Sequence, residues 1–137
     1  MEQFNLIYLL LGVILGGGVL YTLFRKKSPA YDIGYVYVLG SQYLGRNVYK
    51  IGMTEMATPK VRAKDIYGGC TAAPVVYDVV RSYKVIRGNA YPLEKLVHKS
   101  LHKSRINKDR EFFRLNIDKI SDEIINQAKL NKIKILK

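Results

Sequence analysis

The chain has 137 residues, 48% hydrophobic and 25% charged, a composition that excludes disorder over most of its length. The formal net charge is +12, and residues 28–137 carry +10 of it. Such an excess attracts polyanions, either nucleic acid or an anionic lipid surface, although a solvated basic surface is the simpler reading. The single cysteine, Cys70, excludes an intramolecular disulfide and a multi-cysteine zinc site.

The N-terminal segment predicts a membrane anchor over residues 1–27. The 19 residues Leu6–Phe24 are uncharged and mostly apolar, and a helix of that length matches a hydrocarbon core of about 30 Å. Arg25, Lys26 and Lys27 follow directly, which predicts a single-pass protein whose C-terminal part is cytosolic. A cleaved signal peptide and a buried soluble helix are the alternatives, but the acidic Glu2 at the start argues against a signal peptide.

The same segment contains a small-residue pattern. Gly12 and Gly16 are spaced as GxxxG, which favours close approach of two helices in lipid and therefore a possible homodimer. Residues 28–33 follow as a short linker, because Pro29 cannot continue the helix.

The next elements predict a β-hairpin and a helix. Residues 35–39 (YVYVL) and 48–52 (VYKIG) are rich in β-branched and aromatic residues, and the glycine-containing stretch 40–47 separates them as a loop. Thr58 then predicts an N-cap for a helix from Pro59 that ends before Gly68 and Gly69.

The second half continues with alternating element types. We expect a strand over residues 75–86, a helix capped by Asn89 that ends at Leu101, and a short strand over residues 111–115. Asp118 or Ser121 opens a last helix to about Lys129, and residues 132–136 form a short strand or a tail. The order predicts an α+β domain over residues 34–117, a small antiparallel sheet with flanking helices, followed by a C-terminal helix and tail over 118–137.

The usual nucleotide and hydrolase motifs are missing from the sequence, which has no phosphate-binding glycine loop and no G-x-S-x-G. A different set of polar residues remains as candidates for chemistry: Tyr37, Tyr49, Lys50, Arg62, Tyr67, Glu94 and His98.

These residue types suit phosphodiester hydrolysis. Tyr37 with Tyr49 or Lys50 could supply a base, and Arg62 could hold the phosphate. Glu94 lies among apolar helix positions, so we expect it near the core, where a carboxylate needs a cation or a metal. His98 lies one turn further on the same face. Each residue alone is more often structural: a tyrosine packs, and a lone arginine or glutamate lies on the surface.

A zinc site is a weaker alternative. His98 and His102 are spaced as H-x-x-x-H, but no clear third ligand accompanies them and Glu94.

Five stretches in order carry a family resemblance: GYVYVL, YKIGMT, VRAKDIYGG, PLEKLVHKSL and RINKDREFFRL. Over Gly34–Leu115 the chain resembles the GIY-YIG nuclease superfamily, most closely the phage T5-type DNA-binding branch near the meiotically up-regulated nuclease-like group. The resemblance implies a GIY-YIG-like fold that acts on DNA with one divalent ion, Mg²⁺ or Mn²⁺, and without a small-molecule cofactor.

The resemblance also implies roles for residues. Tyr37 takes the place of the first motif's tyrosine, and Lys50-Ile51-Gly52 that of the second motif, with Tyr49 just before. Arg62 matches a phosphate-binding arginine, Glu94 the metal-ligating glutamate and His98 a histidine typical of the branch. Glu111-Phe112-Phe113 matches an R-E-F-F segment, and Asn107 lies near a recurrent asparagine. Two positions depart from these motifs: Tyr35-Val36 stands in place of the first glycine-isoleucine, and Lys50 stands in place of the second tyrosine.

A basic stretch follows Glu94 and suits contact with the DNA backbone. We expect its members to contact nucleic acid together with Arg62: Lys99, Lys103, Arg105, Asn107 and Arg110. The sequence thus supports a membrane-anchored, metal-dependent endonuclease, a DNA-binding module that does not cut, or a viral or microbial membrane protein whose basic domain binds a partner or anionic lipid.

Overall fold

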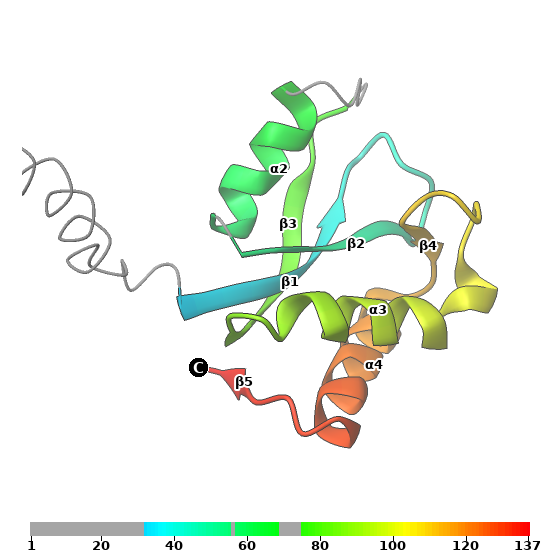
Figure 1. Cartoon of the computed structure of the whole chain (residues 1–137). Coiled ribbons are helices and arrows are strands. Elements are labelled where there is room, and N and C mark those ends of the chain that lie inside the picture. Colours follow the sequence, from blue (N-terminus) through cyan, green and yellow to red (C-terminus); the bar gives the residue numbers. More distant parts are fainter. Residues whose placement is uncertain (1–31, 56, 69–74) are drawn as a thin grey trace, which may run out of the picture.

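The computed structural model describes residues 32–55, 57–68 and 75–137. In this part of the chain an antiparallel five-stranded sheet has the order β4-β2-β1-β3-β5 (Figure 1). The strands are β1 (Ile33–Gly40), β2 (Val48–Thr54), β3 (Asp78–Ile86), β4 (Phe112–Arg114) and β5 (Ile135–Leu136). The helices are α2 (Pro59–Gly68), α3 (Ala90–Ser100) and α4 (Ile117–Leu130), with a 3-10 turn η2 (His102–Ser104). The expected α+β class and the antiparallel sheet are confirmed.

Strand β1 is the centre of the sheet and is buried on both faces. Its neighbours β2 and β3 both run antiparallel to it, so that Tyr37 lies opposite Gly52 on one side and Ser82 on the other. Successive side chains of a strand point to opposite faces. Val36 and Val38 therefore face one side of the sheet, and Tyr37 faces the other.

Helices cover both faces of the sheet (Figure 1). On one face α3 and α4 pack over Val36, Val38, Ile51 and Phe113 in a core whose members are essentially inaccessible to solvent. On the other face α2 packs its buried residues against Tyr37 and Leu39 in a smaller core. The sheet thus places the residues of one strand in two separate apolar environments.

Helix α4 shares the larger core with the sheet, although the sequence analysis set residues 118–137 apart as a C-terminal segment. Ile120, Ile124 and Ala128 are buried there, and after α4 the chain returns to pair β5 with β3. The helix starts earlier than predicted, because the Asn116 side chain caps it by accepting a hydrogen bond from the Asp118 amide at 2.7 Å.

Two other boundaries also differ from the prediction. Strand β3 begins at Asp78 instead of Val75, and β1 begins at Ile33, inside the expected linker. The Thr58 cap is confirmed by a 3.4 Å hydrogen bond from the Val61 amide to its hydroxyl oxygen.

The predicted membrane anchor, most of the linker and the Gly12/Gly16 pair lie outside the described residues. Among the helices that the structure does describe, none has the length and apolar character needed to cross a bilayer.

Candidate active site

A cavity of about 750 Å³ lies where α2, the start of α3 and the segment before β4 meet the sheet. Four residues singled out from the sequence line it, namely Tyr37, Lys50, Arg62 and Glu94. They come from β1, β2, α2 and α3, so the fold brings together side chains from four separate elements. Charged residues that line the same cavity are Lys95, Asp109, Arg110 and Glu111.

Tyr37 lies across the surface of β2, in space that a glycine leaves open. It is 2% exposed and pairs with Gly52, where a β-carbon would lie 2.7 Å from the tyrosine hydroxyl oxygen. Burial raises the pKa of Tyr37, although its hydrogen bond to Arg62 and the charge of that residue act in the opposite direction. The side chain is therefore a neutral phenol at pH 7 whose hydroxyl faces a guanidinium.

Arg62 reaches the cavity from the first half of α2. Its neighbour Ala63 is buried against the sheet, whereas Arg62 itself is exposed to solvent. The capped start of α2 at Thr58 and Pro59 fixes the position of this turn. An exposed guanidinium beside a buried tyrosine hydroxyl is well placed to bind an anion such as a phosphate.

Glu94 and His98 lie one helical turn apart on the buried face of α3 and are only 4% and 5% exposed. Burial raises the pKa of Glu94, and the negative charge of Glu111 adds to the effect. Lys95 offsets part of it, with its Nζ 3.6 Å from a Glu94 carboxylate oxygen. A buried carboxylate is costly unless a cation compensates it, so this position favours a bound cation.

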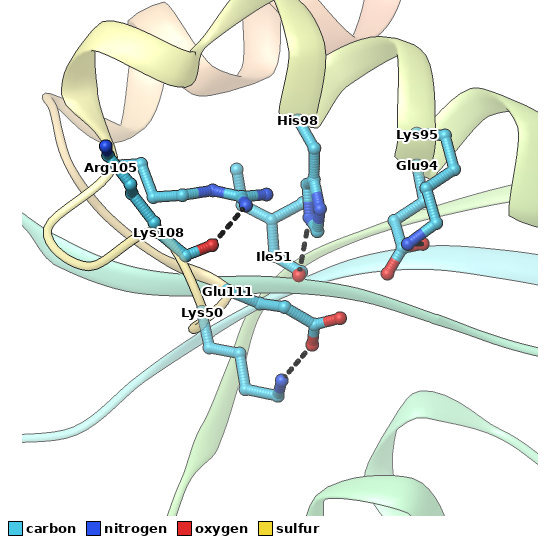
Figure 2. Close-up of polar contacts among 8 residues, drawn as sticks. All are labelled: Lys50, Ile51, Glu94, Lys95, His98, Arg105, Lys108 and Glu111. Atoms are coloured by element: carbon cyan, nitrogen blue, oxygen red, sulfur yellow. Dashed lines mark hydrogen bonds and ion pairs between the residues drawn. The ribbon is translucent and has the colours of Figure 1, made fainter.

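His98 is held in one orientation from two sides. Its Nε2 donates a hydrogen bond of 3.0 Å to the backbone carbonyl of Ile51 (Figure 2). Its ring also lies 5.0 Å from that of Phe113, centroid to centroid. Burial lowers the pKa of His98, while the hydrogen bond to Ile51 acts in the opposite direction. The result is a neutral imidazole, which is the protonation state that a metal ligand requires.

Glu111 approaches the same place from the segment before β4. Its backbone carbonyl accepts a 3.0 Å hydrogen bond from the Ile51 amide, and its carboxylate forms an ion pair with Lys50 (Figure 2). Burial acts to raise the pKa of Glu111, but the hydrogen bond and charge of Lys50 outweigh it, so the pKa is lowered. Glu111 is therefore ionised at neutral pH.

Glu94, His98 and Glu111 converge. One potential ligand atom from each lies within 4.8 Å of those of the other two. One ring nitrogen and two carboxylate oxygens in this arrangement are a donor set that a divalent metal ion can accept.

The family model for the T5orf172 domain matches residues 34–129, which is more than half of the chain. The chain belongs to the T5orf172 domain family. This family is linked to phage and nuclease-like domains. No curated protein and no solved structure matches the chain significantly.

The T5orf172 domain contains every residue of the cavity and nearly all of α4. Some residues predicted from the sequence lie outside the cavity lining. Tyr49 faces the opposite side of the sheet from Lys50 and packs against the larger core. Tyr67 is 51% exposed and does not line the cavity. His102 lies in η2, where its Nδ1 bonds to the Lys99 carbonyl at 2.9 Å, away from Glu94.

The residues expected to contact DNA divide into three groups in the T5orf172 domain. Arg110 lines the cavity. Lys99 and Lys103 are exposed outside it. Arg105 and Asn107 instead stabilise the loop: Arg105 donates to the Lys108 carbonyl at 3.0 Å and stacks on Phe113, and the Asn107 side chain accepts from the Asp109 amide at 3.0 Å.

Three charged residues that line the cavity are not among the predicted site residues: Lys95, Asp109 and Glu111. Of these, Glu111 belongs to the stretch that matches the R-E-F-F segment in the sequence analysis. The pairing of β2 with β4, which places Lys50 opposite Phe112, is what brings Glu111 to Lys50. An acidic residue immediately before an aromatic pair was the available signal.

Proposed function

We propose that this T5orf172 domain is a GIY-YIG-type nuclease domain that hydrolyses phosphodiester bonds of DNA with the help of a divalent metal ion. The observation that carries the proposal is the meeting of Tyr37, Arg62 and Glu94 in one cavity. A neutral phenol, a guanidinium and a buried carboxylate are the groups that water positioning, phosphate binding and metal binding require.

Phosphate binding is the role of the cationic residues. Arg62 offers a planar, permanently charged donor group, which suits two oxygens of one phosphate. Lys95 and Arg110 line the same cavity and add two positive charges to it. These contacts read the backbone of DNA and not its bases, so weak sequence preference follows.

Water positioning falls to Tyr37, and Lys50 lines the same cavity. Since burial keeps the Tyr37 hydroxyl protonated, it positions the attacking water by hydrogen bonding and does not act as a preformed phenolate. Its hydroxyl is held by Arg62 on one side and by the glycine surface of β2 on the other.

Glu94 is the residue that would hold the divalent ion, Mg²⁺ or Mn²⁺. The fit rests on a carboxylate that is 4% exposed, lines the cavity, and has His98 and Glu111 beside it. When bound, such an ion supplies Lewis-acid stabilisation of the charge that develops on the phosphate.

DNA binding without cleavage is the alternative. The observation that favours it is the ion pair of Lys50 with Glu111, because Lys50 takes the place of the second motif's tyrosine and is held away from a free role in catalysis.

Membrane anchorage through Leu6–Phe24 belongs to the proposal as well, and the uncharged run followed by three basic residues supports it. Carbonate extraction of the expressed chain from membranes tests the anchor: release into the soluble fraction would rule it out.

The test of hydrolysis uses the full-length chain in detergent with supercoiled plasmid, comparing Mg²⁺ and Mn²⁺ with EDTA. Glu94→Gln and Arg62→Ala are the site variants. Asp122→Asn and Lys64→Ala are the controls, because both residues are exposed and neither lines the cavity. We expect metal-dependent nicking that both site variants lose and both controls keep. A salt-dependent gel shift without nicking would favour the binding module. The absence of both nicking and a gel shift would contradict action on DNA.

A further inference from the structure

We propose that Glu94, His98 and Glu111 form a three-ligand metal site that selects Mn²⁺ or Zn²⁺ over Mg²⁺, and that Lys50 competes with the metal for Glu111. The inference concerns the cavity of the proposed function, but metal binding can be measured without DNA and without cleavage. It assigns two ligands, His98 and Glu111, beyond the single glutamate that the resemblance implies.

The donor set itself determines the metal class. Mg²⁺ prefers oxygen ligands in near-ideal octahedral geometry and retains several waters. Carboxylates suit Mn²⁺, imidazole suits Zn²⁺, and first-row ions bind mixed nitrogen and oxygen sites with an affinity that is higher for Zn²⁺ than for Mn²⁺. Two carboxylates with one imidazole therefore favour a transition metal over Mg²⁺. The ligand atoms already lie within 4.8 Å of one another, so closure around an ion needs small side-chain movements.

The surroundings of His98 resemble the support that metal-binding histidines receive. A ligating histidine usually donates its second ring N–H to a backbone carbonyl or a carboxylate, which fixes the ring and its tautomer. His98 makes such a bond with Ile51, and Phe113 packs on its ring. These contacts hold the ring in place before any ion arrives.

Lys50 competes with a metal ion for the carboxylate of Glu111. Its ammonium pairs with the Glu111 carboxylate, the same group that would bind the ion. A metal and an ammonium on one carboxylate repel each other, so the metal must weaken the ion pair to use Glu111. Metal binding then frees the Lys50 ammonium inside the cavity, where Arg62 also lies, and adds a cation for a phosphate.

The histidine spacing in the sequence suggested another ligand, His102. The structure instead places His102 in η2 with its Nδ1 on the Lys99 carbonyl, and Glu111 occupies the position of third ligand. His102→Gln is therefore a matched control for His98→Gln.

The experiment measures binding of Mn²⁺, Zn²⁺ and Mg²⁺ to the full-length chain in detergent by titration calorimetry, without DNA. We expect Mn²⁺ and Zn²⁺ to bind at least tenfold more tightly than Mg²⁺. Glu94→Gln, His98→Gln and Glu111→Gln should each weaken Mn²⁺ binding at least tenfold, and His102→Gln should leave it unchanged. Lys50→Met should strengthen Mn²⁺ binding severalfold, because it removes the competing ammonium. If Lys50 only stabilised the fold, the same substitution would weaken Mn²⁺ binding.

A spectroscopic measurement keeps the test valid if a variant folds poorly. Electron spin echo of Mn²⁺ on the wild-type chain should show coupling to a nitrogen of His98. Absence of this coupling, or loss of binding in Glu94→Gln alone, would overturn the three-ligand site while leaving the nuclease proposal intact. Three-ligand binding without any nicking would instead contradict the nuclease proposal and leave the metal site standing.

Discussion

Gly52 of β2 lies directly opposite Tyr37 of β1, and the tyrosine ring occupies the space where a side chain at position 52 would be. A β-carbon there would lie 2.7 Å from the hydroxyl oxygen and 2.9 Å from two ring carbons. Position 52 thus requires glycine for a steric reason: the absence of a side chain lets the tyrosine lie flat on the neighbouring strand and reach Arg62.

Gly52→Ala should displace Tyr37 and destabilise the domain by about 1–3 kcal/mol, since overpacking forces side chains off their preferred rotamers. Nicking should fall more than stability alone explains, because the hydroxyl loses its position. Thermal unfolding and plasmid nicking measure the two effects. Gly68→Ala is the control: a β-carbon at position 68 meets nothing within 4 Å, so it should be neutral or slightly stabilising. Equal effects of the two substitutions would contradict the steric explanation.

Arg62→Ala should reduce nicking by about 10²-fold, because an anion-binding donor is lost from the reacting centre. It should also reduce the slope of the logarithm of DNA affinity against the logarithm of salt concentration by about 1, because one phosphate contact is lost. Fluorescence anisotropy between 50 and 200 mM salt measures that slope. Arg62→Lys should recover little of the nicking activity that Arg62→Ala loses, since an ammonium lacks the planar pair of donors. If Lys64→Ala, on the same helix outside the cavity, has an equal effect, Arg62 has no special role.

His98 predicts a pH dependence of stability, measured in EDTA. Burial lowers the pKa of folded His98 below its ordinary value of 6.5. As pH falls through that value the unfolded state takes up a proton that the folded state does not, so the free energy of unfolding falls. The slope from this one group is at most about 1.4 kcal/mol per pH unit.

The comparison with His98→Gln isolates this contribution. The variant lacks the titrating group, so its stability deficit relative to the wild type should shrink between pH 7.5 and pH 5.5 in urea unfolding experiments. The other titrating groups are present in both proteins and largely cancel. A deficit that grows as the pH falls would mean that folded His98 is protonated.

Two neighbouring isoleucines of α4 test whether this helix belongs to the domain core. Ile124 is fully buried against the sheet, whereas Ile125 is 50% exposed. Ile124→Ala should cost about 2–5 kcal/mol of stability, and Ile125→Ala less than about 1 kcal/mol. Urea unfolding followed by circular dichroism measures both. Similar small losses in the two variants would show that α4 contributes little to the fold.

Local patterns predicted the elements that carry the site. The β-branched and aromatic runs located β1 and β2, and the apolar face of α3 indicated that Glu94 lies near the core. The i, i+4 spacing placed His98 beside it. These features depend on residues close in sequence, where helix and strand periods apply directly.

Long-range pairing and face assignment were harder to predict. The contact of Lys50 with Glu111 depends on the register between β2 and β4, which no local pattern encodes. Tyr49 is different, because neighbouring strand residues face opposite sides, and this rule alone separates it from Lys50. Helix α4 starts before the predicted Asp118 because Asn116, a favourable cap residue, caps it.

The order of the sheet has a consequence for self-association. Its outermost strands, β4 and β5, have three and two residues. Strands that short cover little of their neighbours: β4 pairs with residues 48–50 of β2, and β5 pairs with residues 84 and 85 of β3. Most of the outer edge of β3 therefore has no strand beside it in the described sheet, and a strand of another molecule would extend the sheet there.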